Sequence, residues 1–327
     1  MFSKSNLPTL IRIFSYSILA ITFIFLINNI LTVWFDWPGV KKLFSHYSLF
    51  GFRKLNKPLE DSAFIFSFVQ LILYFISVFF VVFFVLKSIK QTLETDAKIL
   101  SKFTAYFIRS SFWAVLIVGL ADLLISFMVV EKFVEPILGE TLKIKLVIPS
   151  FRITFVHFPL ILISFVIGYY TRTVGFIWLA VLVVASEFFI VVSRFIFEYE
   201  QAFQGDLVRF WYSALYLFAS AYALTHEGHV RVDVLYTGFS ERKKAWTNSM
   251  GSLLLGIPLC LSVLFLGMSN KASIINGPVI SFEVTQQGSN GLYLLYLMAV
   301  YLAVFAVSML TQFTSYFMSS TYKILKN

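Results

Sequence analysis

The sequence has few charges and a single cysteine. Charged residues make up 13% of its 327 residues and hydrophobic residues 59%, whereas soluble domains carry about 25% charged residues. Because so few charges cannot cover a globular surface, the composition excludes a soluble domain and predicts an integral membrane protein. Cys260 has no second cysteine to pair with, which excludes an intramolecular disulfide and a cysteine-based metal cluster.

Helix breakers are scarce within the long apolar runs. A run of about 20 apolar residues can cross the hydrocarbon core as a helix, so we predict helices rather than barrel strands. The predicted fold class is an all-α integral membrane protein with about eight transmembrane helices. The predicted spans are residues 10–33, 63–86, 110–130, 152–170, 174–197, 208–227, 248–269 and 291–318. The first run follows a basic end, as in a signal peptide, but its length predicts a retained helix.

Basic residues predict the orientation of the chain. In the second half they gather in loops that are cytoplasmic when the amino terminus is inside, so both termini are predicted to be cytoplasmic. In the first half the rule does not discriminate, because the predicted loops 34–62 and 87–109 are equally basic. The net charge of +9 is explained by this bias and by contact with anionic lipid, and no nucleic-acid partner is predicted. Loop 34–62 interleaves aromatic residues with lysines, which is typical of a segment in the membrane interface.

The most polar passage is THEGHVRVDVLYTGFSERKKAW, residues 225–246. On a helix, His226 and His229 would share one face, but a catalytic metal site needs three or more protein ligands. Gly228 predicts that the helix ends between the two histidines. We therefore interpret the passage as a connector and predict no metal and no cofactor. A membrane enzyme that uses these histidines and Asp233 stays open as an alternative.

The sequence also lacks nucleophile and phosphate-loop motifs, so no enzyme is predicted. Ser240 and Glu241 predict the start of a helix that continues into the seventh span. Glu187 and Arg194, seven residues apart in the fifth span, and Asp122 in the third span are charged residues at membrane depth. Because such charges usually face protein, we predict that they bond either to a partner subunit or within the chain.

The passage resembles a known family. ASAYALTHEGHVRVDVLYTGFSERKKAW, followed by LLLGIPLCL, is similar to the small membrane subunit (DctQ-like) of TRAP (tripartite ATP-independent periplasmic) transporters, in the mannitol/chloroaromatic-type subgroup. The four-span layout from 174 to 318 agrees with that family. The residues that carry the resemblance are Gly228, His229, Arg231, Asp233, Arg194 and Pro258. Many members have a Trp-x-Glu-Glu stretch where this chain has FQGDLVRF, so Asp206 and Arg209 are partial matches.

The resemblance implies an organisation and a function. Residues 172–327 would form the small-permease four-helix domain, and residues 1–171 an extra membrane region of unknown role. The chain would be a non-catalytic scaffold in the bacterial inner membrane, beside the large (DctM-like) subunit of a sodium-coupled importer of organic acids or related solutes. A periplasmic (DctP-like) protein would deliver the solute. The alternative is a self-sufficient secondary transporter or channel, although the chain lacks the paired broken helices expected of one.

Overall fold

The computed structural model describes residues 6–55, 57–172, 176–199, 202–225, 236–284 and 291–326. Helices dominate these residues, and no strand occurs among them, which confirms the all-α prediction. Two compact units share the chain in an interleaved way. The first comprises residues 1–100, 233–261 and 313–327, and the second residues 101–232 and 262–312.

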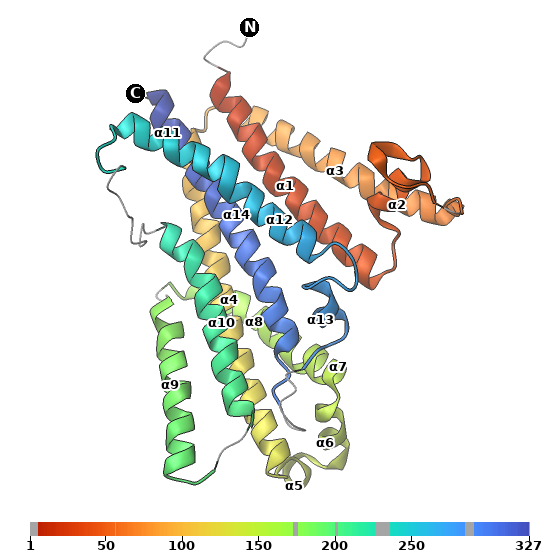
Figure 1. Ribbon diagram of the computed structural model, residues 1–327, viewed down its shortest axis with the longest axis vertical. Helices are drawn as coiled ribbons and strands as arrows, with labels where there is room; N and C mark the ends of the chain where they lie inside the picture. Colours follow the sequence, from red (N-terminus) through yellow and green to blue (C-terminus); the bar gives the residue numbers. More distant parts are fainter. Residues whose placement is uncertain are drawn as a thin grey trace. The chain divides into compact units, whose positions relative to one another are not determined.

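The first unit is built around two long helices. α1 (Leu7–Trp34) packs beside α3 (Asp61–Lys87), and the short α2 (Gly39–His46), in the predicted interface loop, lies against α3 (Figure 1). The 3-10 helix η1 (Leu49–Gly51) follows α2. The unit also contains α11 (Glu241–Gly251), the π-helix η3 (Ser252–Gly256) and the first residues of α12 (Ile257–Gly267).

A small apolar cluster joins distant parts of the chain within this unit. Leu93, Ala97 and Leu100, at the start of α4 (Leu93–Val130), pack with Phe317 and Met318 near the end of α14 (Leu295–Lys326). Ser315 donates a hydrogen bond of 2.7 Å to the carbonyl oxygen of Ala97. The amino-terminal region therefore shares its core with the carboxyl-terminal helix.

The second unit has the larger core. Its elements, besides the rest of α4 and α14, are α5 (Val134–Leu138), α6 (Glu140–Val147), α7 (Pro149–Arg152), the π-helix η2 (Ile153–His157), α8 (Phe158–Tyr170), α9 (Phe176–Phe195), α10 (Ala202–Thr225) and α13 (Asn276–Ile280). Val115 and Val118 of α4 pack with Phe210 and Trp211 of α10 in this core. The two helices approach closely at Gly119, where an added Cβ would lie 2.8 Å from Trp211 Nε1.

Six helical stretches of the described residues are long and apolar enough to cross a membrane, so the chain is a multi-pass membrane protein. They are Leu7–Trp34, Asp61–Lys87, Leu93–Val130, Pro149–Tyr170, Glu241–Gly267 and Leu295–Lys326. α9 and α10 occupy the predicted fifth and sixth spans but are not among the six. The total of eight spans therefore stays a prediction.

α4 is longer than its predicted span of 110–130, because it begins at Leu93. Glu94 and Asp96 lie in its first turn, where acidic side chains stabilise the positive end of the helix dipole. Glu94 also accepts a 2.8 Å hydrogen bond from Lys98 one turn later. Hydropathy detects only the apolar part of such a helix, so the polar first turns were assigned to a loop.

Two spans change their helical geometry just before a proline. η2 precedes Pro159, and η3 precedes Pro258 in the same position. Proline lacks a backbone N–H, and its ring clashes with the carbonyl four residues earlier in a regular α-helix. A wider π turn at that point moves the carbonyl away. Pro258 itself is exposed.

Candidate functional site

The centre of the polar passage is not described. Gly228, His229, Arg231 and Asp233 lie outside the described residues, as does His226. α10 ends at Thr225, and the structure is described again from Tyr236. Ser240 caps α11 as predicted, because its side chain accepts a 3.4 Å hydrogen bond from the backbone N–H of Lys243.

Asp206, one of the partial family matches, is a buried structural acid. It lies in the first turns of α10, is 1% exposed, and accepts a 3.4 Å hydrogen bond from the backbone N–H of Leu292. Arg209 lies one turn later with 60% of its side chain exposed, and its Nη1 is 4.0 Å from Asp206 Oδ1. The pair therefore connects α10 to the segment that enters α14.

Asp122 of α4 binds the backbone of Tyr293, the residue that follows Leu292 in the segment that enters α14. Its Oδ2 accepts a 2.7 Å hydrogen bond from the backbone N–H of Tyr293. Its Oδ1 lies 2.6 Å from Arg152 Nε and 2.9 Å from His157 Nε2. The Asp122, Arg152 and His157 side chains are at most 1% exposed. Two carboxylates, Asp122 and Asp206, thus bind adjacent backbone N–H groups just before α14, where the helix dipole favours negative charge.

Arg152 and His157 also make contacts outside the Asp122 carboxylate. Arg152 donates to the Asp122 carbonyl at 2.6 Å and to Ser126 at 2.8 Å, and its guanidinium lies 4.3 Å from the centre of the Tyr293 ring. His157 Nδ1 lies 3.1 Å from the Tyr296 hydroxyl. A buried charge is tolerated only when it is paired and hydrogen-bonded. Asp122 and Arg152 meet the pairing condition within the chain.

Asp122 was predicted to bond to a partner or within the chain, and it bonds within the chain. Its partners Arg152 and His157, in contrast, were not predicted from the sequence. The missed signal is their spacing of five residues across η2, because a π turn places residues five apart close together. Both side chains consequently reach the same oxygen of Asp122.

The first unit contains a second buried ion pair. Arg12 of α1 is 1% exposed, and its Nε lies 2.5 Å from Asp96 Oδ2. The same guanidinium donates to the Ser88 carbonyl at 2.8 Å and to the Ser88 hydroxyl at 2.9 Å. Ser88 follows the last residue of α3, so this pair fixes the connection between α3 and α4.

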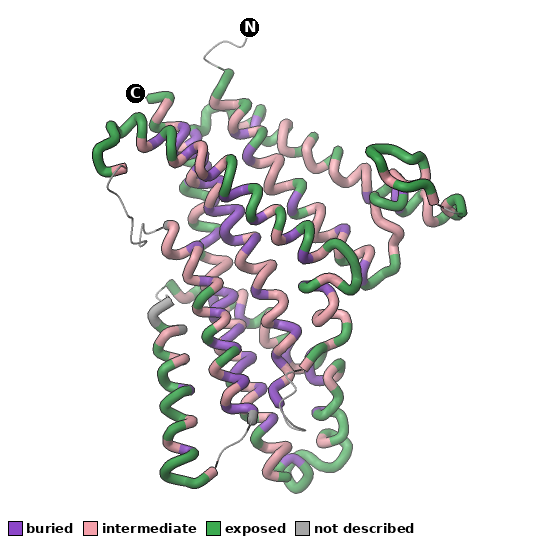
Figure 2. Tube along the Cα trace, viewed as in Figure 1, coloured by how far each residue is buried: buried purple, intermediate pink, exposed green. Residues whose placement is uncertain are grey.

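Glu187 and Arg194, in contrast, lie on a helix whose surface is mostly exposed. Both are on α9, which packs against α10 and is exposed over most of its length (Figure 2). Glu187 is exposed and forms no hydrogen bond or ion pair with any described residue. Its neighbours on the exposed surface, Val184, Phe188 and Val191, are apolar.

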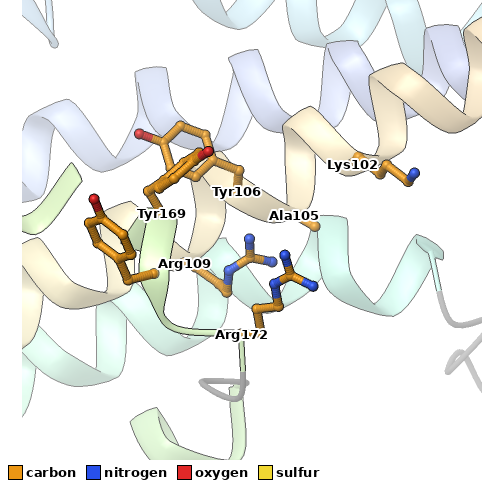
Figure 3. Close-up of a pocket in the computed structure, with 7 residues that line it drawn as sticks. Lys102, Ala105, Tyr106, Arg109, Tyr169 and Arg172 are labelled. Carbon is orange, nitrogen blue, oxygen red and sulfur yellow. The ribbon is translucent and has the colours of Figure 1, made fainter. Parts of the chain in front are cut away.

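Metal binding has no support in the part of the chain that the structure describes, where no group of three or more His, Cys, Asp and Glu residues could hold an ion. One cavity of about 760 Å³ lies in the second unit, at the junction of α4 with the end of α8 (Figure 3). Its lining residues are Lys102, Ala105, Tyr106, Arg109, Tyr169, Tyr170 and Arg172.

Comparison with known families gives one match. Residues 179–315 match the family model described as the DctQ component of tripartite ATP-independent periplasmic transporters. The matched segment contains Asp206, Arg209, Glu187 and the undescribed polar core, whereas Asp122 and the cavity residues precede it. Neither the curated proteins nor the solved structures gave a significant match.

Proposed function

Because residues 179–315 match the family model of the DctQ component of TRAP transporters, we propose that this chain is the small scaffold subunit of such a transporter. It would sit in the bacterial inner membrane with both termini in the cytoplasm. It would pack beside the large membrane subunit of a sodium-coupled importer of organic acids or related solutes, and a periplasmic binding protein would supply the solute. The chain itself would perform no catalysis.

The observation that carries this proposal, besides the family match, is the exposed acid on α9. Glu187 lies halfway along an apolar helix of 20 residues and faces away from its own chain. A charged side chain at the centre of a membrane helix costs about 3 kcal/mol when it faces lipid. A cation or hydrogen-bond donor on a partner helix would offset that cost. We therefore place the large subunit against the exposed face of α9.

The pairing of the buried charges within the chain supports a scaffold subunit over a self-sufficient transporter. Asp122 pairs with Arg152, and Asp96 pairs with Arg12. A transporter that binds an ion and a solute at mid-membrane needs polar groups free to contact them, usually at broken helices. In the described residues the buried carboxylates Asp96 and Asp122 are already paired within the chain.

The first experiment is co-purification of the full-length tagged chain from its native membrane in mild detergent. We expect the large subunit to elute with it in a stoichiometric ratio. Glu187→Gln should lower the recovered amount of large subunit, whereas Glu241→Gln, an equivalent change at an exposed site outside α9, should not. A chain that elutes alone and drives solute uptake alone in liposomes would show that the alternative function is correct.

A further inference from the structure

The cavity between α4 and the end of α8 gathers positive charge, and no acid is among its described lining residues. Lys102 and Arg109 come from α4, and Arg172 lies two residues after α8. Figure 3 shows the side chains of Arg109 and Arg172, which both line the cavity. None of the three cations forms an ion pair with a described carboxylate. Arg109 Nε is also buried and has no hydrogen-bond partner among the described residues.

The walls of this cavity are held in place by specific contacts. Gly168 of α8 packs so closely on Ser110 of α4 that an added Cβ would lie 2.4 Å from the serine oxygen. Trp113 Nε1 donates a 2.8 Å hydrogen bond to Thr171, next to Arg172. The two basic walls are therefore fixed relative to each other, which lowers the entropy cost of binding a ligand between them.

Aromatic hydroxyls complete the lining. Tyr106 uses its hydroxyl to donate to the carbonyl of Phe165 at 3.1 Å, and its ring packs edge-on against Tyr169 at 6.4 Å. Tyr169 and Tyr170 are 70% and 76% exposed. Tyrosines with an apolar ring and a polar tip are typical of the membrane headgroup level, which is also where the apolar part of α8 ends.

We propose that this cavity binds a phosphate group, carried by an anionic membrane lipid. Two guanidinium groups that line one cavity repel each other unless an anion lies between them, and the planar fork of arginine matches phosphate oxygens. The buried Arg109 Nε supplies a donor that has no hydrogen-bond partner among the described residues. Basic pockets between membrane helices are suited to anionic headgroups in this way, and the tyrosine rings would contact the adjoining glycerol and acyl carbons.

The proposal can be tested with the purified full-length chain in detergent. Its melting temperature and its lipid adducts in native mass spectrometry are measured with phosphatidylglycerol, with phosphatidylcholine and with inorganic phosphate. We expect phosphatidylglycerol to raise the melting temperature and to bind at least about tenfold more tightly than phosphatidylcholine, because both carry a phosphate but the basic side chains of the cavity would repel the choline cation. Inorganic phosphate acting equally well would identify a soluble phosphate as the ligand of the same site.

The variant Arg109→Gln/Arg172→Gln should remove the phosphatidylglycerol effect. Arg242→Gln/Lys243→Gln removes the same charge from an exposed site outside the cavity and serves as the matched control. If the first variant does not fold, the single change Arg172→Gln is tested instead, because that side chain is exposed. Equal responses of the wild type, the cavity variant and the control to every ligand would overturn the proposal.

Discussion

At the scale of single residues, the buried charges act as structural contacts rather than as a binding site. Asp122 joins α4, α7, η2 and the segment before α14 through contacts of 2.6 to 2.9 Å. Buried ion pairs add little stability compared with a well-packed apolar core, but the loss of one partner leaves an uncompensated charge. This asymmetry makes their role testable.

Asp122→Asn should destabilise the protein by about 3 to 5 kcal/mol, because Arg152 would keep a buried charge without its partner. Thermal unfolding of the full-length chain in detergent measures the effect. The double variant Asp122→Leu/Arg152→Met removes both charges and should recover much of the loss. A double variant as unstable as the single one would contradict this account.

An exposed ion pair provides the contrasting case. Lys143 donates a 2.6 Å hydrogen bond to Glu135, outside the spanning helices, and this bond holds the pKa of the Glu135 carboxyl below its ordinary value. The stability that this pair contributes would be present at a pH above the ordinary pKa of Glu135. It would be lost as the pH falls through the lowered pKa of Glu135 in the folded protein. Since water screens the pair, we expect Glu135→Gln to leave the melting temperature unchanged. A large decrease would mean that the segment is covered in the assembled protein.

At the scale of helices, close packing between α4 and α10 depends on one glycine. A Cβ at Gly119 would lie 2.8 Å from Trp211 Nε1 and 3.3 Å from Phe210. Gly119→Val should therefore destabilise the protein by about 1 to 3 kcal/mol through overpacking. Gly205→Ala on α10 is the control, because nothing lies within 4 Å of its added Cβ; it should be neutral or slightly stabilising. Unfolding in detergent distinguishes the two.

The helices were largely predictable from the sequence, and their irregular parts were not. Apolar runs predicted the long helices because hydrocarbon requires about 20 apolar residues per span. The same signal could not find the polar first turns of α4 or the π turns before Pro159 and Pro258. Nor could it find the pairing of Arg152 with Asp122, because a contact between distant residues leaves no local pattern in one sequence.

At the scale of the whole molecule, buried residues on both sides of the predicted boundary at residue 171 pack together within each unit. Within the second unit, α4 supplies Val115 and Val118 to the core that contains Phe210 and Trp211 of α10. Within the first unit, Leu93 packs with the end of α14. The region outside the family match thus contributes buried surface to both units, and its proposed role is to enlarge the scaffold.

Deletion of residues 1–171 tests this role. The remaining chain would lose Asp122, leaving the Tyr293 backbone N–H without its acceptor, and would expose the apolar face of α10 that α4 covers. Since a buried Val or Phe side chain contributes about 1.5 to 3 kcal/mol, we expect the shortened chain to accumulate poorly and to elute as aggregates, as measured by gel filtration in detergent. Adding residues 1–171 as a separate chain should restore part of the monodisperse fraction. A shortened chain that elutes normally, binds the large subunit and supports full transport would show that the amino-terminal region is dispensable for folding and for function.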